Sequence, residues 1–352
     1  MNKYRILFTV FLYFSSAVIA GPVLYAPTGE KNKVVVIDLE TNTIMARIDE
    51  LENAHGLATS SNSEYLVAGS MMLLPSKTSA AGPDKPAVVN ETEHAAHHTD
   101  AAISTPSLSE QSYLSIIHAQ QKKIIRRVPV RGLTHHTAVS PDGKYAIAVH
   151  SGEGGISVVN LNKMLVITTL DTGQWPNYAV FSPSGKHLYI SNAGTNTISD
   201  IDTQNWQIAR KLNAGKGPEH LVLSIDGRTL YSANKGDASV SAIDLVSGAI
   251  NKTYAVGKEP HGIDISDDGR WLFVASKKEG VITRIDLSSE ARQIAELSPA
   301  PYHLAYIKGL NKIYVSSRKA SKIWVIDAVT LAVKDTIFLE QGIAHQMVIR
   351  NE

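Results

Sequence analysis

Residues 217–248 read GPEHLVLSIDGRTLYSANKGDASVSAIDLVSG and contain the pattern from which the fold can be predicted. Three apolar runs, EHLVLS, TLYSAN and SVSAIDL, alternate with the polar connections IDGR and KGDA, and a fourth run, AINKTYAV, follows VSG. Alternating β-branched and aromatic residues bounded by Gly, Asp and Asn are typical of strands joined by tight hairpins. The stretch therefore predicts four short antiparallel strands in one repeat.

The same pattern recurs along the chain. The segments that open each repeat are HGLATS (55–60), HHTAVS (135–140), NYAVFS (177–182), EHLVLS (219–224), HGIDIS (261–266), YHLAYI (302–307) and HQMVIR (345–350). From residue 135 the starts lie 42, 42, 42, 41 and 43 residues apart, and the step of 80 from residue 55 contains one repeat and 38 further residues. Four strands per repeat, repeated radially, predict an all-β, seven-bladed β-propeller, whose closed ring leaves few exposed sheet edges.

The two ends of the chain have separate interpretations. Residues 1–20, MNKYRILFTVFLYFSSAVIA, have the basic start, apolar middle and small-residue end of a signal peptide, which predicts an exported periplasmic protein without a membrane span. The remainder, residues 21–352, is predicted to be a single propeller with a flexible insertion at about 73–110. Because the mature chain starts with the second strand of a blade, at Val23–Ala26, we expect the segment His345–Ile349 to supply the missing first strand and close the ring.

Composition excludes several classes of function. The chain of 352 residues has no cysteine, which excludes disulfides, thiolate metal sites, iron–sulfur clusters and covalent c-type haem. Its net charge of +1 provides no field for a nucleic-acid backbone, so no nucleic-acid partner is expected. A monomer is expected, and no nucleophile motif supports an enzyme. The unusual feature is the number of histidines, which is 13.

Most of these histidines are predicted to lie on one face of the disc. In a four-stranded blade the innermost strand begins on the upper face beside the central channel. Seven histidines occupy the first or second position of such a strand: His55, His135, His136, His220, His261, His303 and His345. Imidazole is a common ligand of zinc and copper, so this upper mouth is predicted to be a metal site. Because successive strand residues point to opposite faces, we expect three or four of the seven to share one ion.

The insertion carries three further histidines in EHAAHH, which are His94, His97 and His98. It lies between the second and third strands of its blade and should emerge on the same face, where its histidines would be accessory ligands. Its Ser, Thr, Ala and Pro content predicts a mobile loop. Glu219 and Asp264 also lie near the channel and are candidates for a metal ligand or a general base.

Segments such as GPEHLVLSIDGRTLYSANKGDASVSAIDLVSG and EPHGIDISDDGRWLFVAS (259–276) resemble the YVTN-type β-propeller repeat family. That family is similar to the propeller of nitrous oxide reductase, which binds copper through histidines at blade starts, including an adjacent pair that His135-His136 resembles. A histidine-bearing loop above a histidine-lined mouth also resembles periplasmic zinc chaperones built on a propeller. The resemblance implies a metal carrier whose upper face meets a periplasmic metal-binding or transporter protein.

Two alternatives remain open at this point. One is an oxidoreductase or cofactor-handling protein with a copper cluster or a non-covalent haem-type tetrapyrrole in the channel mouth. The other is a non-enzymatic scaffold whose upper face binds another protein and whose histidines are incidental. Propellers host many unrelated activities, so the fold does not choose among them.

Overall fold

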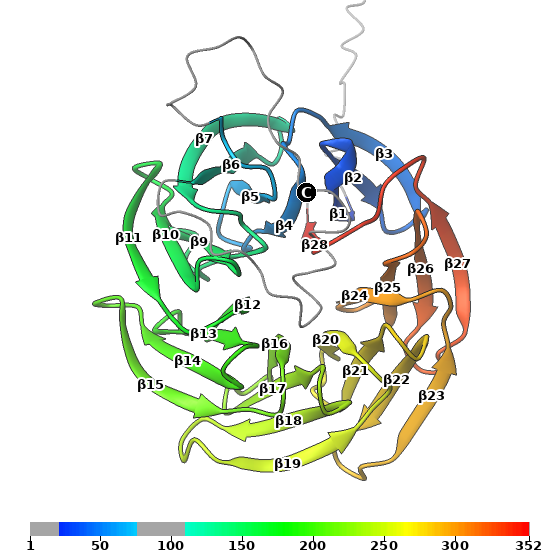
Figure 1. Ribbon diagram of the computed structural model, residues 1–352. Coiled ribbons are helices and arrows are strands. Elements are labelled where there is room, and N and C mark those ends of the chain that lie inside the picture. Colours follow the sequence, from blue (N-terminus) through cyan, green and yellow to red (C-terminus); the bar gives the residue numbers. More distant parts are fainter. Residues whose placement is uncertain (1–20, 76–109, 352) are drawn as a thin grey trace, which may run out of the picture.

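The computed structural model describes residues 21–75 and 110–351, which form seven four-stranded antiparallel sheets around a central axis (Figure 1). The predicted seven-bladed propeller is confirmed. We number the sheets as blades 1 to 7 in chain order. The predicted signal peptide and the histidines of the insertion lie outside the described residues. Within those residues, no helix has the length and apolar character needed to cross a bilayer.

Each blade runs from an inner strand at the axis to an outer strand at the rim. Blade 1 contains β28 (Val348–Asn351), β1 (Pro22–Thr28), β2 (Lys33–Asp38) and β3 (Thr43–Ile48), with a short 3-10 turn η1 (Gly29–Lys31). Blade 2 contains β4 (Ala54–Ala58), β5 (Tyr65–Ser70), β6 (Gln111–His118) and β7 (Lys123–Arg131). Blade 3 contains β8 (His136–Val139), β9 (Tyr145–His150), β10 (Gly155–Asn160) and β11 (Leu165–Asp171). Blade 4 contains β12 (Pro176–Phe181), β13 (His187–Asn192), β14 (Thr197–Asp202) and β15 (Gln207–Asn213).

The remaining three blades repeat this order. Blade 5 contains β16 (Pro218–Leu223), β17 (Thr229–Asn234), β18 (Ser239–Asp244) and β19 (Ile250–Ala255). Blade 6 contains β20 (Pro260–Ile265), β21 (Trp271–Ser276), β22 (Val281–Asp286) and β23 (Arg292–Glu296). Blade 7 contains β24 (Pro301–Ile307), β25 (Lys312–Ser317), β26 (Lys322–Asp327) and β27 (Val333–Phe338).

The two ends of the chain meet in blade 1, as predicted, but three residues later than expected. The closing strand is β28, which pairs antiparallel with β1, instead of the predicted segment His345–Ile349. The chain bends at Gln346, whose buried side chain turns toward the neighbouring blades and so interrupts the strand. Its Oε1 accepts hydrogen bonds from the backbone N–H groups of Leu57 at 3.2 Å and Thr137 at 3.1 Å, and its Nε2 donates to the Thr137 carbonyl at 2.9 Å. Gln346 therefore connects blade 1 to blades 2 and 3.

In blades 3, 5 and 6 an Asp-Gly turn joins the inner strand to the second strand. In blade 5, Ser224 Oγ donates to Asp226 Oδ1 at 2.6 Å and accepts from the backbone N–H of Thr229 at 2.9 Å. Gly227 follows with φ +69°, a left-handed conformation that glycine adopts without steric cost. This local network explains why Ser-x-Asp-Gly recurs at the start of the hairpins.

The blades are held together by apolar faces that pack between neighbouring sheets. The middle strands β9 and β10 are buried almost throughout, whereas the outer strand β11 alternates between exposed and half-buried residues. Between blades 3 and 4, Ile147, Val149 and Val158 pack in one cluster with Leu188 and Ile190. Burial of each such side chain contributes roughly 1.5–3 kcal/mol, so the core is distributed around the ring.

An extra residue near the start of the inner strands shapes the channel mouth. In blade 5, Pro218 pairs with Asn234 and Leu221 pairs with Ser232. An interval of three residues on β16 therefore lies opposite an interval of two residues on β17. The same irregularity occurs in blades 2, 4, 6 and 7. Such a bulge redirects side chains that regular pleating would send to opposite faces. In blade 6 it requires Gly262, because a Cβ there would lie 2.4 Å from the Tyr302 carbonyl oxygen.

Candidate metal centre

All seven blade-start histidines lie together at the channel mouth. Each is buried, with 0–4% of its surface exposed. Their potential ligand atoms form three overlapping groups, within each of which all atoms lie within 4.8 Å of one another: His136, His220, His261 and His303; His55, His303 and His345; His55, His135 and His136. The largest group contains four histidines, and the sharing of one ion by three or four of them stays a prediction. Bulges in blades 2, 5, 6 and 7 help to bring both registers of the strand entries to the axis.

The group His136, His220, His261 and His303 comes from blades 3, 5, 6 and 7 and has the number of ligands that zinc takes. His220 Nε2 lies 3.2 Å from His136 Nε2. Two nitrogens bound to one tetrahedral zinc at about 2.0–2.1 Å would be separated by about 3.3 Å. The ring centroids of His220, His261 and His303 lie 4.3–4.9 Å apart, so small side-chain movements would complete a shared site.

Hydrogen bonds orient two of these four rings. His136 Nδ1 donates to the Asn177 carbonyl oxygen at 2.7 Å, and His261 Nδ1 donates to Glu219 Oε2 at 3.2 Å. Because a carbonyl and a carboxylate oxygen accept here, the proton of each neutral ring is assigned to Nδ1, which leaves the Nε2 lone pair for a metal. A carboxylate or carbonyl behind a ligating histidine is the usual outer support of a metal site.

Two histidines of this group, His136 and His303, are held in the neutral form that binds metals. Burial, followed by the neighbouring histidines His220 and His261, holds the pKa of His136 well below its usual value. Burial and the surrounding histidines also lower the pKa of His303 strongly. His303 Nε2 is buried and has no hydrogen-bond partner among the residues that the structure describes. A buried polar nitrogen without a partner costs about 1–3 kcal/mol, and a bound ion would offset that cost.

The other three histidines extend the cluster toward blade 1. His55 stacks on His135 with ring centroids 4.6 Å apart, and its ring lies 3.9 Å from that of His345. Since His136 and His303 belong to two groups each, the seven rings form one continuous cluster rather than separate sites.

Two tyrosines enclose the rings. Tyr178 stacks on His220 with centroids 4.1 Å apart, and Tyr302 stacks on His261 at 4.2 Å. Both tyrosines restrict ring rotation at the mouth and limit access of water. Neither tyrosine, nor Asn177, was predicted from the sequence, although all three occupy the first or second position of a blade start.

The other histidines that the structure describes lie outside the cluster. His150 bonds the Leu133 carbonyl oxygen and Ser157 Oγ, and burial lowers its pKa to about 4. His187 bonds Asp200 at 2.8 Å. The predicted accessory ligands His94, His97 and His98 lie outside the described residues, so the structure places none of them. Asp264 accepts bonds from the backbone of Ile265 and Tyr306, both at 2.8 Å, which is a structural role.

A seven-bladed propeller with a buried histidine cluster at its mouth is the class of protein that this geometry defines. Residues 84–344 match the model of the YNCE-like beta-propeller family, and the chain belongs to that family. The predicted membership of a propeller repeat family is thus confirmed. None of the curated proteins matches the chain.

Solved structures share the fold at low sequence identity. Hydrazine synthase of Kuenenia stuttgartiensis superposes with a TM-score of 0.67 at 13% identity, covering 92% of this chain and 100% of that one. A putative 6-phosphogluconolactonase from Bacteroides uniformis superposes with a TM-score of 0.70 at 14% identity, and the match covers 94% of this chain and 99% of that one. Dihydro-heme d1 dehydrogenase NirN in complex with DHE superposes with a TM-score of 0.65 at 15% identity, covering 94% of this chain and 66% of that one. At these identities the likeness is one of fold alone.

Proposed function

We propose that this protein binds a transition metal ion, zinc or copper, through His136, His220, His261 and His303 and acts as an exported metal carrier. The observation that carries the proposal is the convergence of four buried imidazoles whose ligand atoms all lie within 4.8 Å. The ion is cargo in this proposal, and the protein carries out no reaction on it.

The donor set favours zinc or copper over harder ions. Imidazole nitrogen suits both metals, whereas magnesium and calcium prefer oxygen ligands. His55, His135 and His345 lie beside the four-histidine group and provide alternative ligands. An ion could therefore move by exchanging one imidazole for another, which suits a carrier that must release its cargo.

A carrier function also agrees with the sequence. The predicted signal peptide favours a periplasmic location, and the histidines of the insertion, His94, His97 and His98, are predicted to stand on the same face as the cluster. The proposed recipient is a periplasmic metal-binding or transporter protein that docks at that face.

Burial of the cluster favours an ion over a tetrapyrrole. The seven rings contact one another and two tyrosines, which leaves no open imidazole face for a macrocycle. No histidine is found among the described residues that line the large pocket beside the cluster. A tetrapyrrole in that pocket would lack an axial histidine.

Elemental analysis tests the proposal. The untagged protein is purified without chelators beside a variant in which His261, His303 and His345 are alanine, and beside the variant His118→Ala as a control for loss of a histidine elsewhere. Near-stoichiometric zinc or copper in the wild type and the control, and much less in the folded triple variant, is the expected result. Absence of metal from the wild type, even after incubation with zinc and Cu(I), would refute the carrier function and leave the scaffold alternative.

A further inference from the structure

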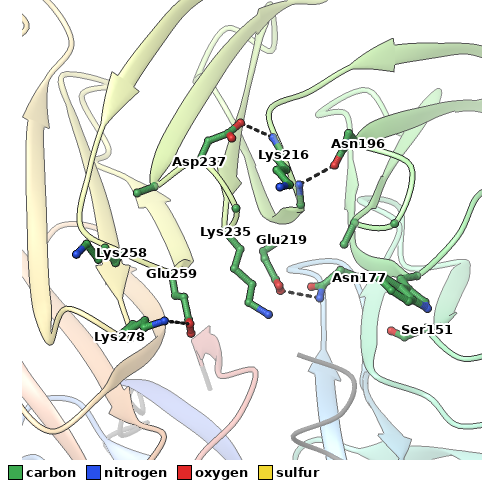
Figure 2. A pocket seen from close by; sticks show the side chains of 16 residues that line it. Ser151, Asn177, Asn196, Lys216, Glu219, Lys235, Asp237, Lys258, Glu259 and Lys278 are labelled. Carbon is green, nitrogen blue, oxygen red and sulfur yellow. Dashed lines mark hydrogen bonds and ion pairs between the residues drawn. The ribbon is translucent and has the colours of Figure 1, made fainter. Parts of the chain in front are cut away.

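A pocket of about 830 Å³ adjoins the histidine cluster at blades 4, 5 and 6 (Figure 2). It is lined by loops at the upper ends of these blades, and its polar side chains include Asn177, Lys216, Glu219, Lys235, Lys258 and Lys278. Its volume lies in the range of about 300–1,000 Å³ that is typical of small-molecule sites.

The floor of this pocket is formed by Asn177 and Glu219, the two residues that orient the rings of His136 and His261. Asn177 and Glu219 are 5% and 3% exposed and line the pocket, while they also bond His136 and His261 on the other side. Asn177 Nδ2 donates to Glu219 Oε2 at 2.7 Å, which ties the two floor residues together (Figure 2). Asn177 Oδ1 is buried and has no hydrogen-bond partner in the described part of the chain, so a ligand seated on the floor would satisfy it.

The rim of the pocket carries lysines at repeated positions. Lys216 and Lys258 precede β16 and β20 by the same spacing, and both are exposed. The backbone N–H of Lys216 donates to Asp237 Oδ2 at 2.5 Å, and that of Lys258 donates to Glu279 Oε2 at 2.9 Å. The two acids thus fix the loops, while the lysine side chains extend from a defined backbone.

The acids of the pocket are largely engaged by the protein itself. Glu259 forms ion pairs with Lys277 at 3.3 Å and Lys278 at 3.5 Å. Burial alone would raise the pKa of Glu259, but Lys277, Lys235 and Lys278 hold it below its usual value. Glu219 bonds Asn177 and His261. Among the described residues, the lining carries four lysines against three acidic residues, so its formal charge is +1 and the pocket favours an anionic ligand.

This charge pattern bears on how an ion reaches the buried histidines. A bare divalent cation would be repelled by the rim, whereas an ion whose chelator retains free carboxylates would be attracted to it. We propose that the pocket receives the metal as a complex with a small polycarboxylate, from which the ion passes by way of Glu219 to the four histidines. The transfer exchanges chelator oxygens for imidazole nitrogens, with no change of oxidation state. This inference rests on the proposed function.

Loading kinetics of the full-length metal-free protein test the inference. The probes are zinc citrate, which is anionic, and zinc bound by tris(2-aminoethyl)amine, which is cationic, at equal free zinc. The double variant Lys216→Ala/Lys258→Ala is compared with Lys123→Ala/Lys211→Ala, which removes two exposed lysines from the outer strands β7 and β15. Equilibrium affinity for free zinc is measured for all three proteins.

We expect the wild type and the control to load faster from zinc citrate than from the cationic complex, with a rate that falls as salt is added. The pocket variant should lose about tenfold of its citrate rate while its equilibrium affinity for zinc stays unchanged. Equal citrate rates for the pocket variant and the control would overturn the inference alone. Failure of the wild type to bind either zinc or Cu(I) at equilibrium would overturn the proposed function as well.

Discussion

Glu219 Oε2 lies 3.2 Å from His261 Nδ1, and the two residues occupy the same position in consecutive blades. Asn177, one blade earlier at that position, donates to the same oxygen at 2.7 Å. The three side chains form a hydrogen-bonded arc around the axis that faces the pocket on one side and the four-histidine group on the other. The first position of the repeat therefore holds a candidate metal ligand, His261, in one blade and the residues that orient it, Glu219 and Asn177, in the two blades before it.

Replacement of Glu219 by glutamine tests this arc. We expect Glu219→Gln to weaken zinc binding by about tenfold to 100-fold, because a carboxylate behind a ligating histidine raises its basicity and fixes its tautomer. The affinity is measured by competition with a chelator, and the tautomer of His261 by the ¹⁵N chemical shifts of its ring. Glu296→Gln, at an exposed position, is the control. An unchanged tautomer together with unchanged affinity would show that Glu219 has no positioning role.

Gln346 is predicted to stabilise the closed ring. Its side chain bonds the backbone of Leu57 and Thr137 in two other blades. We expect Gln346→Leu to lower the free energy of unfolding by about 2–3 kcal/mol, since it leaves buried backbone groups without partners. Urea denaturation measures the change against Gln341→Ala, an exposed neighbour. Equal midpoints for the two variants would contradict the role of Gln346 as a connection between blades.

Glu153 gives the fold a pH dependence. Burial raises its pKa from the usual 4.5 to about 7, although backbone N–H groups and Arg131 oppose the shift. Since the native state holds this proton more tightly than the unfolded chain, the stability that Glu153 contributes falls as the pH rises from about 4.5 to about 7. We expect Glu153→Gln to be more stable than the wild type at pH 8, by about 2 kcal/mol, and to show little advantage below pH 5.

Thermal denaturation at pH 5 and pH 8 measures this effect, with Glu296→Gln as a control whose difference from the wild type should not depend on pH. A Glu153→Gln variant that matches the wild type at pH 8 would mean that Glu153 is ionised in the native state without cost.

The sequence contained enough information for the fold and for the positions of the seven histidines in it. The alignment of the repeats shows directly which residues occupy equivalent positions; His55 and His261, for example, both open an inner strand. Ring closure was predicted, but the bend at Gln346 moved the closing strand, because a side chain that bonds to other blades leaves no local pattern. The convergence of both strand registers also depends on bulges, which no short motif marks. Asn177 and Tyr302 were missed because an asparagine or a tyrosine at a strand start does not by itself indicate a metal site, although their repeat position matches that of His261.

The central claim is that the four-histidine group binds the metal, and X-ray absorption at the zinc edge of the protein loaded with one equivalent of zinc tests it most directly. We expect a first shell of nitrogens at about 2.0–2.1 Å with the outer-shell pattern of several imidazoles. The variant His261→Ala/His303→Ala should show fewer imidazoles around the zinc, and His118→Ala should keep the full pattern. A shell dominated by oxygen in the wild type, or an imidazole pattern unchanged in the His261→Ala/His303→Ala protein, would contradict the account.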